Sequence, residues 1–286
     1  MDLLDKMNRA LNYIEDNLRE KIDISQAAKL AYCSNFNFQR MFSFMADVSL
    51  AEYIRRRRLS MAAMDLLSTD TKILDVAIEY GYSSTASFSR AFQSVHGVNP
   101  SEVRNPGVKI KEYSRISFEI TIKGVEAMNY RIEEFGQIRL IGWKEYMSMI
   151  NGENFQRIPQ FWQETYQSGK CEEMMKYNDN KNLGCLGVCA NAGENGFDYL
   201  IATCSSKEIP DGMAELIIQP SKYVIFECVG KMPESIQNVW KRIFIEWFPA
   251  ANYELVDGPQ IEWYSDGDMA SDSYKSEIWI PIRNKA

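Results

Sequence analysis

A short pattern occurs twice in the first hundred residues, fifty positions apart. Ser34–Phe42 reads SNFNFQRMF, and Ser84–Phe92 reads STASFSRAF. Each copy follows a short apolar stretch and a turn, and each opens with a serine suited to cap a helix. The repeat predicts two copies of one unit, in which two helices are joined by a tight turn. In such a unit the second helix is placed to enter the major groove of DNA.

In the first unit, Asp23 and Gln26 have the spacing of a helix start, and the helix is expected to run through Leu30. Ser34 caps the next helix. At 100° per residue, one arc of that helix is apolar and the other carries Phe36, Gln39 and Arg40. We interpret the apolar arc as packed in a core and the other arc as free to enter a groove.

The second unit repeats this arrangement. Gly81 suits a left-handed position after a helix that ends near Tyr80, and Ser84 caps a helix with an apolar side and a small polar side. Between the units, Ser49 and Glu52 have capping-box spacing and open a helix through about Leu67. A short closing helix is predicted to start at Asn99, Pro100 and Glu102, and an amphipathic helix comes first, with Leu4, Met7, Leu11, Ile14 and Leu18.

These motifs resemble the AraC/XylS family of transcription regulators over residues 1–107, with FQRMF, YIRRRRL, DVAIEYGY and FSRAF in order. The resemblance implies two recognition helices about 34 Å apart that read two successive half-sites of promoter DNA in the major groove. It assigns base contacts to Phe36, Gln39 and Arg40 in the first unit and to Thr85, Ala86 and Arg90 in the second. The alternative for each arginine is a phosphate contact or an ion pair within the domain.

The run Arg55–Arg58 does not predict a basic face, because four successive residues are spread around a whole helix. Residues 1–107 hold 13 Lys and Arg against 13 Asp and Glu, so the net charge of −7 belongs to the remainder. Affinity for random DNA, which depends on phosphate neutralisation, is therefore expected to be modest.

Length and a 45% hydrophobic content predict two soluble domains, 1–107 and 126–286, joined by residues 108–125 as a linker with a first strand. No membrane-length apolar run or signal peptide is seen, which predicts a cytoplasmic protein with no membrane partner. The six cysteines form no CxxC pair and the single histidine is His96, so we expect reduced thiols, no metal site and no cofactor.

From residue 116 the period changes to two, with Ile116, Phe118, Ile120 and Ile122 alternating with polar residues. Strands are predicted at 128–135, 138–146, 183–189, 197–204, 213–219, 223–229, 260–264 and 274–282, and helices near 158–168 and 233–247. The order is two strands, a helix and two strands, given twice. A duplicated ββαββ unit predicts an α+β domain with a ligand crevice between the copies.

The segments YRIEEF, IPQFW, FDYLIATC, YVIFECVG, PQIEWY and EIWIPI resemble the GyrI-like effector-binding domain, from about residue 126 to the end. That resemblance implies binding of bulky, often cationic aromatic molecules, as in multidrug response. Such a pocket needs aromatic planes and a carboxylate. The candidates, each with a place in the core as its alternative, are Glu262, Tyr264, Glu277, Trp279, Trp143, Tyr146, Phe161, Trp162 and Tyr199.

Together these features predict a ligand-responsive transcription regulator, an activator with promoter DNA, a small-molecule effector and RNA polymerase as partners, acting as a monomer or a homodimer. We expect no enzyme activity and no catalytic residue, because His96 lies in the DNA-binding domain and no nucleophile–base pair is available in the crevice. Two alternatives stay open. In one, the second domain hydrolyses its ligand with Glu262 as the base. In the other, it binds a protein such as gyrase.

Overall fold

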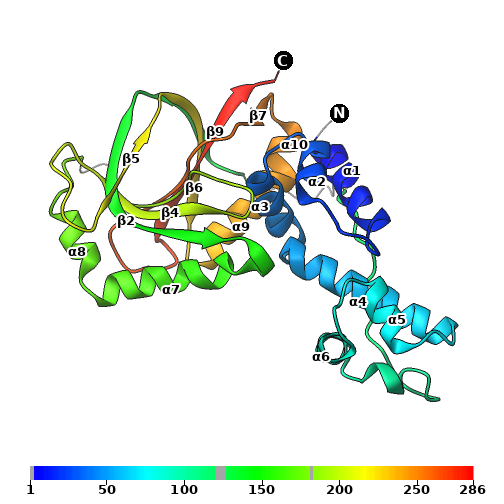
Figure 1. Cartoon of the computed structure of the whole chain (residues 1–286). Coiled ribbons are helices and arrows are strands. Elements are labelled where there is room, and N and C mark those ends of the chain that lie inside the picture. The colour runs from blue at the N-terminus through cyan, green and yellow to red at the C-terminus, as the bar shows by residue number, and fades with distance from the viewer. Residues whose placement is uncertain (1–2, 120–126, 181–182, 286) are drawn as a thin grey trace.

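The computed structural model describes residues 3–119, 127–180 and 183–285. The first part of the chain is helical, and the second is a curved antiparallel sheet with helices (Figure 1). The predicted order of an all-α domain and an α+β domain is confirmed. The described residues contain no helix long and apolar enough to cross a membrane.

Four helices of the first domain begin where the sequence predicts them, because a side chain caps their free backbone amides. Asp23 accepts hydrogen bonds from the amides of Ser25 and Gln26, and Ser34, Ser49 and Ser84 each accept one from their own helix. The bounds are α1 Leu3–Asp16, α2 Ile24–Leu30, α3 Asn35–Ala46, α4 Leu50–Ser68, α5 Ile73–Glu79 and α6 Thr85–His96.

One local prediction changes in the structure, and two others are confirmed. The Glu52 carboxylate does not complete a capping box with Ser49, because it accepts hydrogen bonds from the guanidinium groups of Arg55 and Arg56. Asn99 and Glu102 do form a capping box, and the short helix that they open is the single turn η1 Pro100–Glu102. Gly81 has the predicted left-handed conformation, with φ at 83°.

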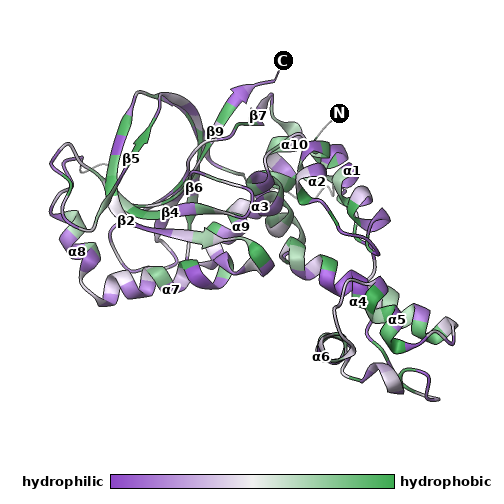
Figure 2. Cartoon of the chain, in the orientation of Figure 1, coloured by the Kyte–Doolittle hydropathy of each residue, from purple (hydrophilic) through white to green (hydrophobic). Residues whose placement is uncertain are grey.

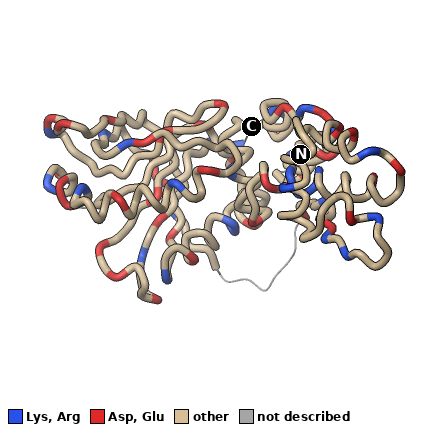
Figure 3. The backbone as a smooth tube through the Cα atoms, turned by 60° about the horizontal axis from the view of Figure 1, so that its bottom comes forward, with Lys and Arg blue, Asp and Glu red and all other residues tan. Residues whose placement is uncertain are grey.

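The arginine run on α4 holds the first domain together. Arg57 is buried and forms an ion pair with Glu15 on α1 at 2.8 Å, and Arg58 donates to the carbonyl oxygens of Leu18 and Glu20. With Arg55 and Arg56 paired to Glu52, the whole run has partners within the domain. Figure 3 shows positive and negative residues interspersed along this part of the chain, as the neutral charge balance predicts.

The described part of the predicted linker packs on the first domain. The Asn8 side chain bonds both the amide and the carbonyl of Phe118, and Arg57 donates to the carbonyl of Tyr113. Phe118 also meets Phe42 with ring centroids 5.9 Å apart. No strand forms up to residue 119, because side chains of the first domain satisfy this backbone. The rest of the predicted strand, Ile120 and Ile122, lies outside the described residues.

The second domain is built around an approximate twofold axis. In the sheet the strands follow the order β1-β6-β9-β8-β3-β4-β2-β5, with β7 paired to β9. Exchanging the two ββαββ copies reverses this order, so the axis passes between β8 and β3. The strands are β1 Tyr130–Phe135, β2 Ile138–Ser148, β3 Cys185–Ala190, β4 Gly196–Cys204, β5 Ala214–Ile218, β6 Ser221–Val229, β7 Tyr253–Leu255, β8 Gln260–Tyr264 and β9 Lys275–Asn284.

Two long helices, one from each copy, lie on one face of this sheet. Helix α7, Asn154–Gln167, starts four residues before the predicted 158, and α9, Glu234–Arg242, continues as the π-helical turn η3 Ile243–Trp247. Figure 2 shows hydrophilic and hydrophobic bands along α7, as expected for a helix with one buried face. The elements that were not predicted are short: η2 Ile150–Gly152, α8 Lys170–Met175, α10 Phe248–Ala250 and β7.

The Glu15–Arg57 pair generates a first prediction. Burial alone raises the pKa of Glu15, but hydrogen bonds from Arg57 and Tyr53 outweigh it and hold the pKa below its usual value. Glu15→Gln leaves the Arg57 charge buried without its partner and is expected to lower the free energy of unfolding by about 3 kcal/mol. Urea denaturation followed by circular dichroism measures this loss.

The matched control is Glu52→Gln, which removes a half-buried partner of two more exposed arginines and should cost about 1 kcal/mol or less. Since the pKa of Glu15 is lowered in the folded state, the difference between parent and Glu15→Gln should be full above the ordinary carboxyl pKa and shrink as the pH falls below it. Equal losses for the two variants would contradict the structural role of the buried pair.

Candidate functional site

Glu262 lies on β8, beside the twofold axis, on the face of the sheet that carries α7 and α9. Its Oε1 accepts a hydrogen bond from Trp240 Nε1 on α9 at 2.7 Å, and its Oε2 accepts one from the Tyr264 hydroxyl at 2.7 Å. The side chain keeps 20% of its exposure. A mostly buried carboxylate is costly, and these two donors account for part of its stabilisation.

Aromatic side chains form the wall beside this carboxylate. Trp162 on α7 donates Nε1 to the Tyr199 hydroxyl at 2.8 Å, and its ring meets the Tyr264 ring edge-on at 5.2 Å. Burial, and next the nearby Glu262 charge, raise the pKa values of Tyr199 and Tyr264 well above the ordinary range. Both phenols are therefore neutral, and Tyr264 serves as a donor to the carboxylate.

Gly187 on β3 makes room for this wall. It is paired in register with Glu262, and a Cβ atom at this position would lie 2.4 Å from the Tyr199 hydroxyl oxygen and 3.3 Å from Trp162 Cζ2. Only a residue without a side chain allows Tyr199 to reach the centre of the sheet.

Helix α3 of the first domain enters this crevice with its outer face. The Arg40 guanidinium lies 4.3 Å from the centroid of the Trp240 ring and 5.2 Å from that of Phe44. One of its terminal nitrogens is 3.6 Å from Glu262 Oε1, and the other is 3.6 Å from Cys189 Sγ. The charge of Arg40 thus sits among aromatic faces beside a carboxylate.

Further contacts surround Arg40. The Phe36 ring meets Phe197 on β4 at 4.9 Å, and the Phe44 ring stacks on Trp240 at 5.0 Å. Asn37 donates to Asp257 and accepts from Gln260, both at 2.8 Å. Lys241 on α9 forms an ion pair with Asp47, at the end of α3. Helix α3 is therefore held along its length by the second domain.

The prediction that the outer arc of α3 is free to enter a groove is wrong for this conformation. Phe36 keeps only 4% of its exposure, Gln39 contacts Met149, and the Arg40 side chain lies in the crevice with 14% of its exposure left. The reason is chemical, since an aromatic ring and an arginine suit an acidic aromatic crevice as well as they suit DNA. In the second unit, Thr85, Ala86 and Arg90 are exposed as expected.

The structure separates the predicted ligand residues into several places. Glu262, Tyr264, Trp162 and Tyr199 come together at the crevice. Glu277 and Trp279 lie on the opposite face of the sheet, where Glu277 pairs with Arg131 at 2.7 Å and Trp279 stacks on Phe135.

The remaining candidates have other surroundings. Trp143 donates to the Lys170 carbonyl, Phe161 is 8% exposed in the core under α7, and Tyr146 is 58% exposed. Sequence reasoning missed Trp240, which closes the other side of the crevice. Its spacing with Ile236 and Phe244 is that of any buried helix stripe, so the pattern carried no signal for a site.

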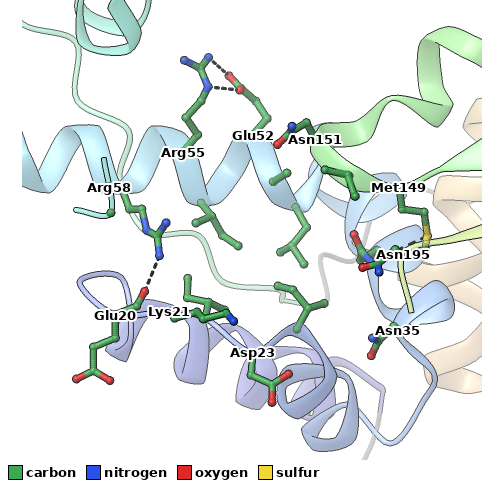
Figure 4. Close-up of a pocket in the computed structure, with 18 of the residues that line it drawn as sticks. Glu20, Lys21, Asp23, Asn35, Glu52, Arg55, Arg58, Met149, Asn151 and Asn195 are labelled. Atoms are coloured by element: carbon green, nitrogen blue, oxygen red, sulfur yellow. Dashed lines mark hydrogen bonds and ion pairs between the residues drawn. The ribbon is translucent and has the colours of Figure 1, made fainter. Parts of the chain in front are cut away.

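A second, more polar hollow lies where α2 and α4 face the loops of the second domain around Met149 and Asn195. Figure 4 shows it lined by charged and amide side chains, with Arg58 bonded to Glu20 and Arg55 bonded to Glu52. Its volume is about 1140 Å³. Because side chains of both charges line it, among them Lys21, Arg58, Glu20 and Asp23, it offers no single-sign surface to a ligand.

The six thiols and the single histidine are the remaining side chains that could carry metal or nucleophilic chemistry. Across the described ranges, no three His, Cys, Asp or Glu side chains are placed to hold a metal ion, and the six cysteines are free. His96 is buried between the carbonyl oxygens of Lys111 and Leu59, and burial lowers its pKa.

Comparison with known families agrees with this arrangement. Residues 131–282 match the family described as integron-associated effector binding protein, and residues 27–106 match a helix-turn-helix domain. The first match spans more than half of the chain. The chain belongs to this effector-binding family and carries an AraC-type domain in front of it.

The alignments with relatives of the AraC-type domain cover different shares of those relatives. Regulatory protein SoxS of Salmonella typhimurium is 36% identical over 33% of this chain and 89% of SoxS. The transcriptional activator AarP of Providencia stuartii is 33% identical over 34% of this chain and 73% of AarP. The match to the regulator YbfP of Bacillus subtilis, at 36% identity over 34% of this chain, spans only 33% of YbfP.

The effector-binding domain has a solved relative. The structure of SAV2435 bound to tetraphenylphosphonium aligns with a TM-score of 0.50 and 28% identity, over 55% of this chain and 94% of that one. Binding of this cation is a finding about SAV2435. The residues of the crevice are the basis for any ligand assigned to the present chain.

The geometry around Gly187 generates a second prediction. In Gly187→Ala the new methyl group displaces the Tyr199 hydroxyl and breaks its hydrogen bond from Trp162, with an expected loss of about 1–3 kcal/mol in the free energy of unfolding. Chemical denaturation followed by tryptophan fluorescence measures it. The control is Gly136→Ala, whose methyl group meets nothing within 4 Å. An unchanged stability of Gly187→Ala would show that Tyr199 is not locked in the wall.

Proposed function

We propose that this protein is a transcription regulator that senses a bulky aromatic cation through its effector-binding domain. The observation that carries the proposal is the crevice itself, where a carboxylate faces a cation against the Trp240 ring. Cations bind aromatic faces most strongly when water is excluded, and a neighbouring carboxylate adds selectivity for charge. The tetraphenylphosphonium complex of SAV2435 supports the same ligand class.

We further propose that α3 and α6 read two half-sites of promoter DNA. The contacts are assigned to Phe36, Gln39 and Arg40 on α3, and to Thr85, Ala86 and Arg90 on α6. The tandem repeat and the serine caps support this, because each cap fixes the entry of a recognition helix. Activation and contact with RNA polymerase follow from the AraC/XylS resemblance, and the name of AarP supports activation.

The domain is proposed to bind its ligand without turning it over. Both oxygens of Glu262 already accept hydrogen bonds, from Trp240 and Tyr264, which favours a fixed charge over a base that activates water. The chain's single histidine lies in the DNA-binding domain. The alternative of a protein-binding crevice has one observation in its favour, because α3 shows that a helix fits there.

The charge-sensing role is tested with tetraphenylphosphonium and the neutral triphenylphosphine oxide. Glu262→Gln keeps the shape of the side chain and removes its charge, so the ratio of the cation affinity to the neutral affinity should fall about tenfold. Isothermal titration calorimetry measures both ligands on the full chain. Using the ratio removes any change in access to the crevice, and an unchanged ratio would reject charge sensing.

The DNA-reading role is tested on the exposed recognition helix. Arg90→Ala is expected to weaken binding to a selected operator by about 1–3 kcal/mol and to relax base preference at one position. Operators are selected from random duplexes, and affinities are compared by gel shift at fixed salt. Arg283→Ala, an exposed arginine of the other domain, is the control. Uniform weakening on every sequence would indicate a phosphate contact instead.

A further inference from the structure

We propose that helix α3 is an internal ligand of the effector crevice, with Arg40 in the place of the effector cation, so that effector binding and the closed conformation exclude each other. This inference rests on the proposed function, namely a cation-binding crevice and a DNA-reading α3. The structure described here is then the state in which one of the two DNA readers is withheld.

The first step is the position of Arg40. Its guanidinium has the environment that a cationic aromatic ligand needs, with the Trp240 ring at 4.3 Å, the rings of Phe44 and Phe36 within 5.8 Å, and the Glu262 carboxylate at 3.6 Å. Arginine stacks on aromatic faces and tolerates partial burial because its charge is delocalised. Arg40 thus uses the recognition chemistry that the crevice holds for its effector.

The second step is space. With α3 in place the walls of the crevice are covered, because Trp240 is 1% exposed and Tyr199 is 2% exposed. The Phe44 ring of α3 stacks on the Trp240 ring at 5.0 Å, in the place where an aromatic ligand would stack. A bulky cation therefore enters only when α3 withdraws.

The third step is that α3 presents the same face to the crevice and to DNA. Phe36, Gln39 and Arg40 are the proposed base contacts, and all three face the second domain. A helix covered on this face cannot lie in the major groove. On α6 the corresponding face is open, since Thr85, Ala86 and Arg90 are exposed.

The fourth step is that the closed contact is imperfect. Among the described residues, Arg40 Nε and Gln260 Oε1 are buried without a hydrogen-bond partner, and the Arg40–Glu262 distance of 3.6 Å exceeds that of a direct charge-assisted hydrogen bond. Unsatisfied buried groups destabilise the closed contact. A competing ligand therefore needs less binding free energy to displace α3. A bulky aromatic cation also replaces the ring contacts that Trp240 loses when Phe44 leaves.

The coupling then has a definite sign. Effector and operator both bind the open state, so each raises the affinity of the other by the same factor. Two contacts outside the crevice also hold α3 against the second domain, Asn37–Asp257 and Lys241–Asp47. They stabilise the closed state, and the second-domain partners Asp257 and Lys241 belong to neither proposed binding site.

The decisive experiment measures tetraphenylphosphonium binding to the full chain and to Arg40→Met. Removing the competing cation is expected to tighten binding about fivefold or more. Arg90→Met, the matched change on the open helix, is expected to leave the affinity unchanged. In parallel, hydrogen exchange should show that the cation increases amide exchange in residues 35–46 of the parent protein.

Because removing Arg40 also removes a proposed base contact, DNA binding is followed in a second variant. Asp257→Ala with Lys241→Ala loosens α3 and should tighten binding to the selected operator in the absence of effector. The control, Glu134→Ala with Lys222→Ala, removes an ion pair elsewhere on the second domain and should change nothing.

The outcomes separate the two proposals. If the cation binds the parent protein but Arg40→Met binds it equally or more weakly, and exchange in residues 35–46 is unchanged, competition is rejected while the effector site stands. If the cation binds neither protein, the proposed effector class is rejected and the competition falls with it. Tighter cation binding by Arg40→Met together with tighter operator binding by the loosened variant supports the inference.

Discussion

The carboxylate of Glu262, placed at the centre of a nine-stranded sheet, constrains the rest of the second domain. A charge there is stable only if donors and a cation surround it. Trp240 and Tyr264 supply the donors, which fixes α9 against β8, and Gly187 leaves the space in which Tyr199 and Trp162 complete the wall. One side of the Glu262 carboxylate stays uncovered, and a positive charge on that side stabilises it. Arg40 supplies this charge in the closed state, so the same requirement links the two domains.

Local patterns were sufficient to predict most elements, because caps and periodicity act over a few residues. The side chains of Ser34, Ser49 and Ser84 accept the backbone hydrogen bonds that their positions predict, and the period of two located every long strand. The predictions failed where short-range signals compete. Glu52 had capping-box spacing, yet two arginines within one turn took its carboxylate. Segment 108–119 had strand alternation in its second half, yet side chains of the first domain satisfied its backbone.

The candidate site shows which information a single sequence lacks. Alternation correctly put Glu262 with Tyr264 and Glu277 with Trp279 on their own strands, but only the register between strands decides whether the two pairs share a face. In the sheet Glu262 is opposite Ile278 and Trp263 is opposite Glu277, so the two carboxylates point to opposite sides. Trp240 was missed for a related reason. A tryptophan on an apolar helix stripe has the same pattern whether it fills a core or faces a ligand, and its indole nitrogen reveals a role only beside Glu262.

The two DNA-reading units differ in a way that follows from their side chains. Helix α6 presents small polar residues and one arginine, which have little affinity for an aromatic crevice and stay in solvent. Helix α3 presents Phe36 and Arg40, and Phe44 follows one turn later, so its outer face is both apolar and cationic. The apolar part of such a face is costly to leave in water. With DNA absent, the acidic aromatic crevice is the partner that the chain itself provides, and under the coupling proposed above the two copies of one motif become one constant reader and one conditional reader.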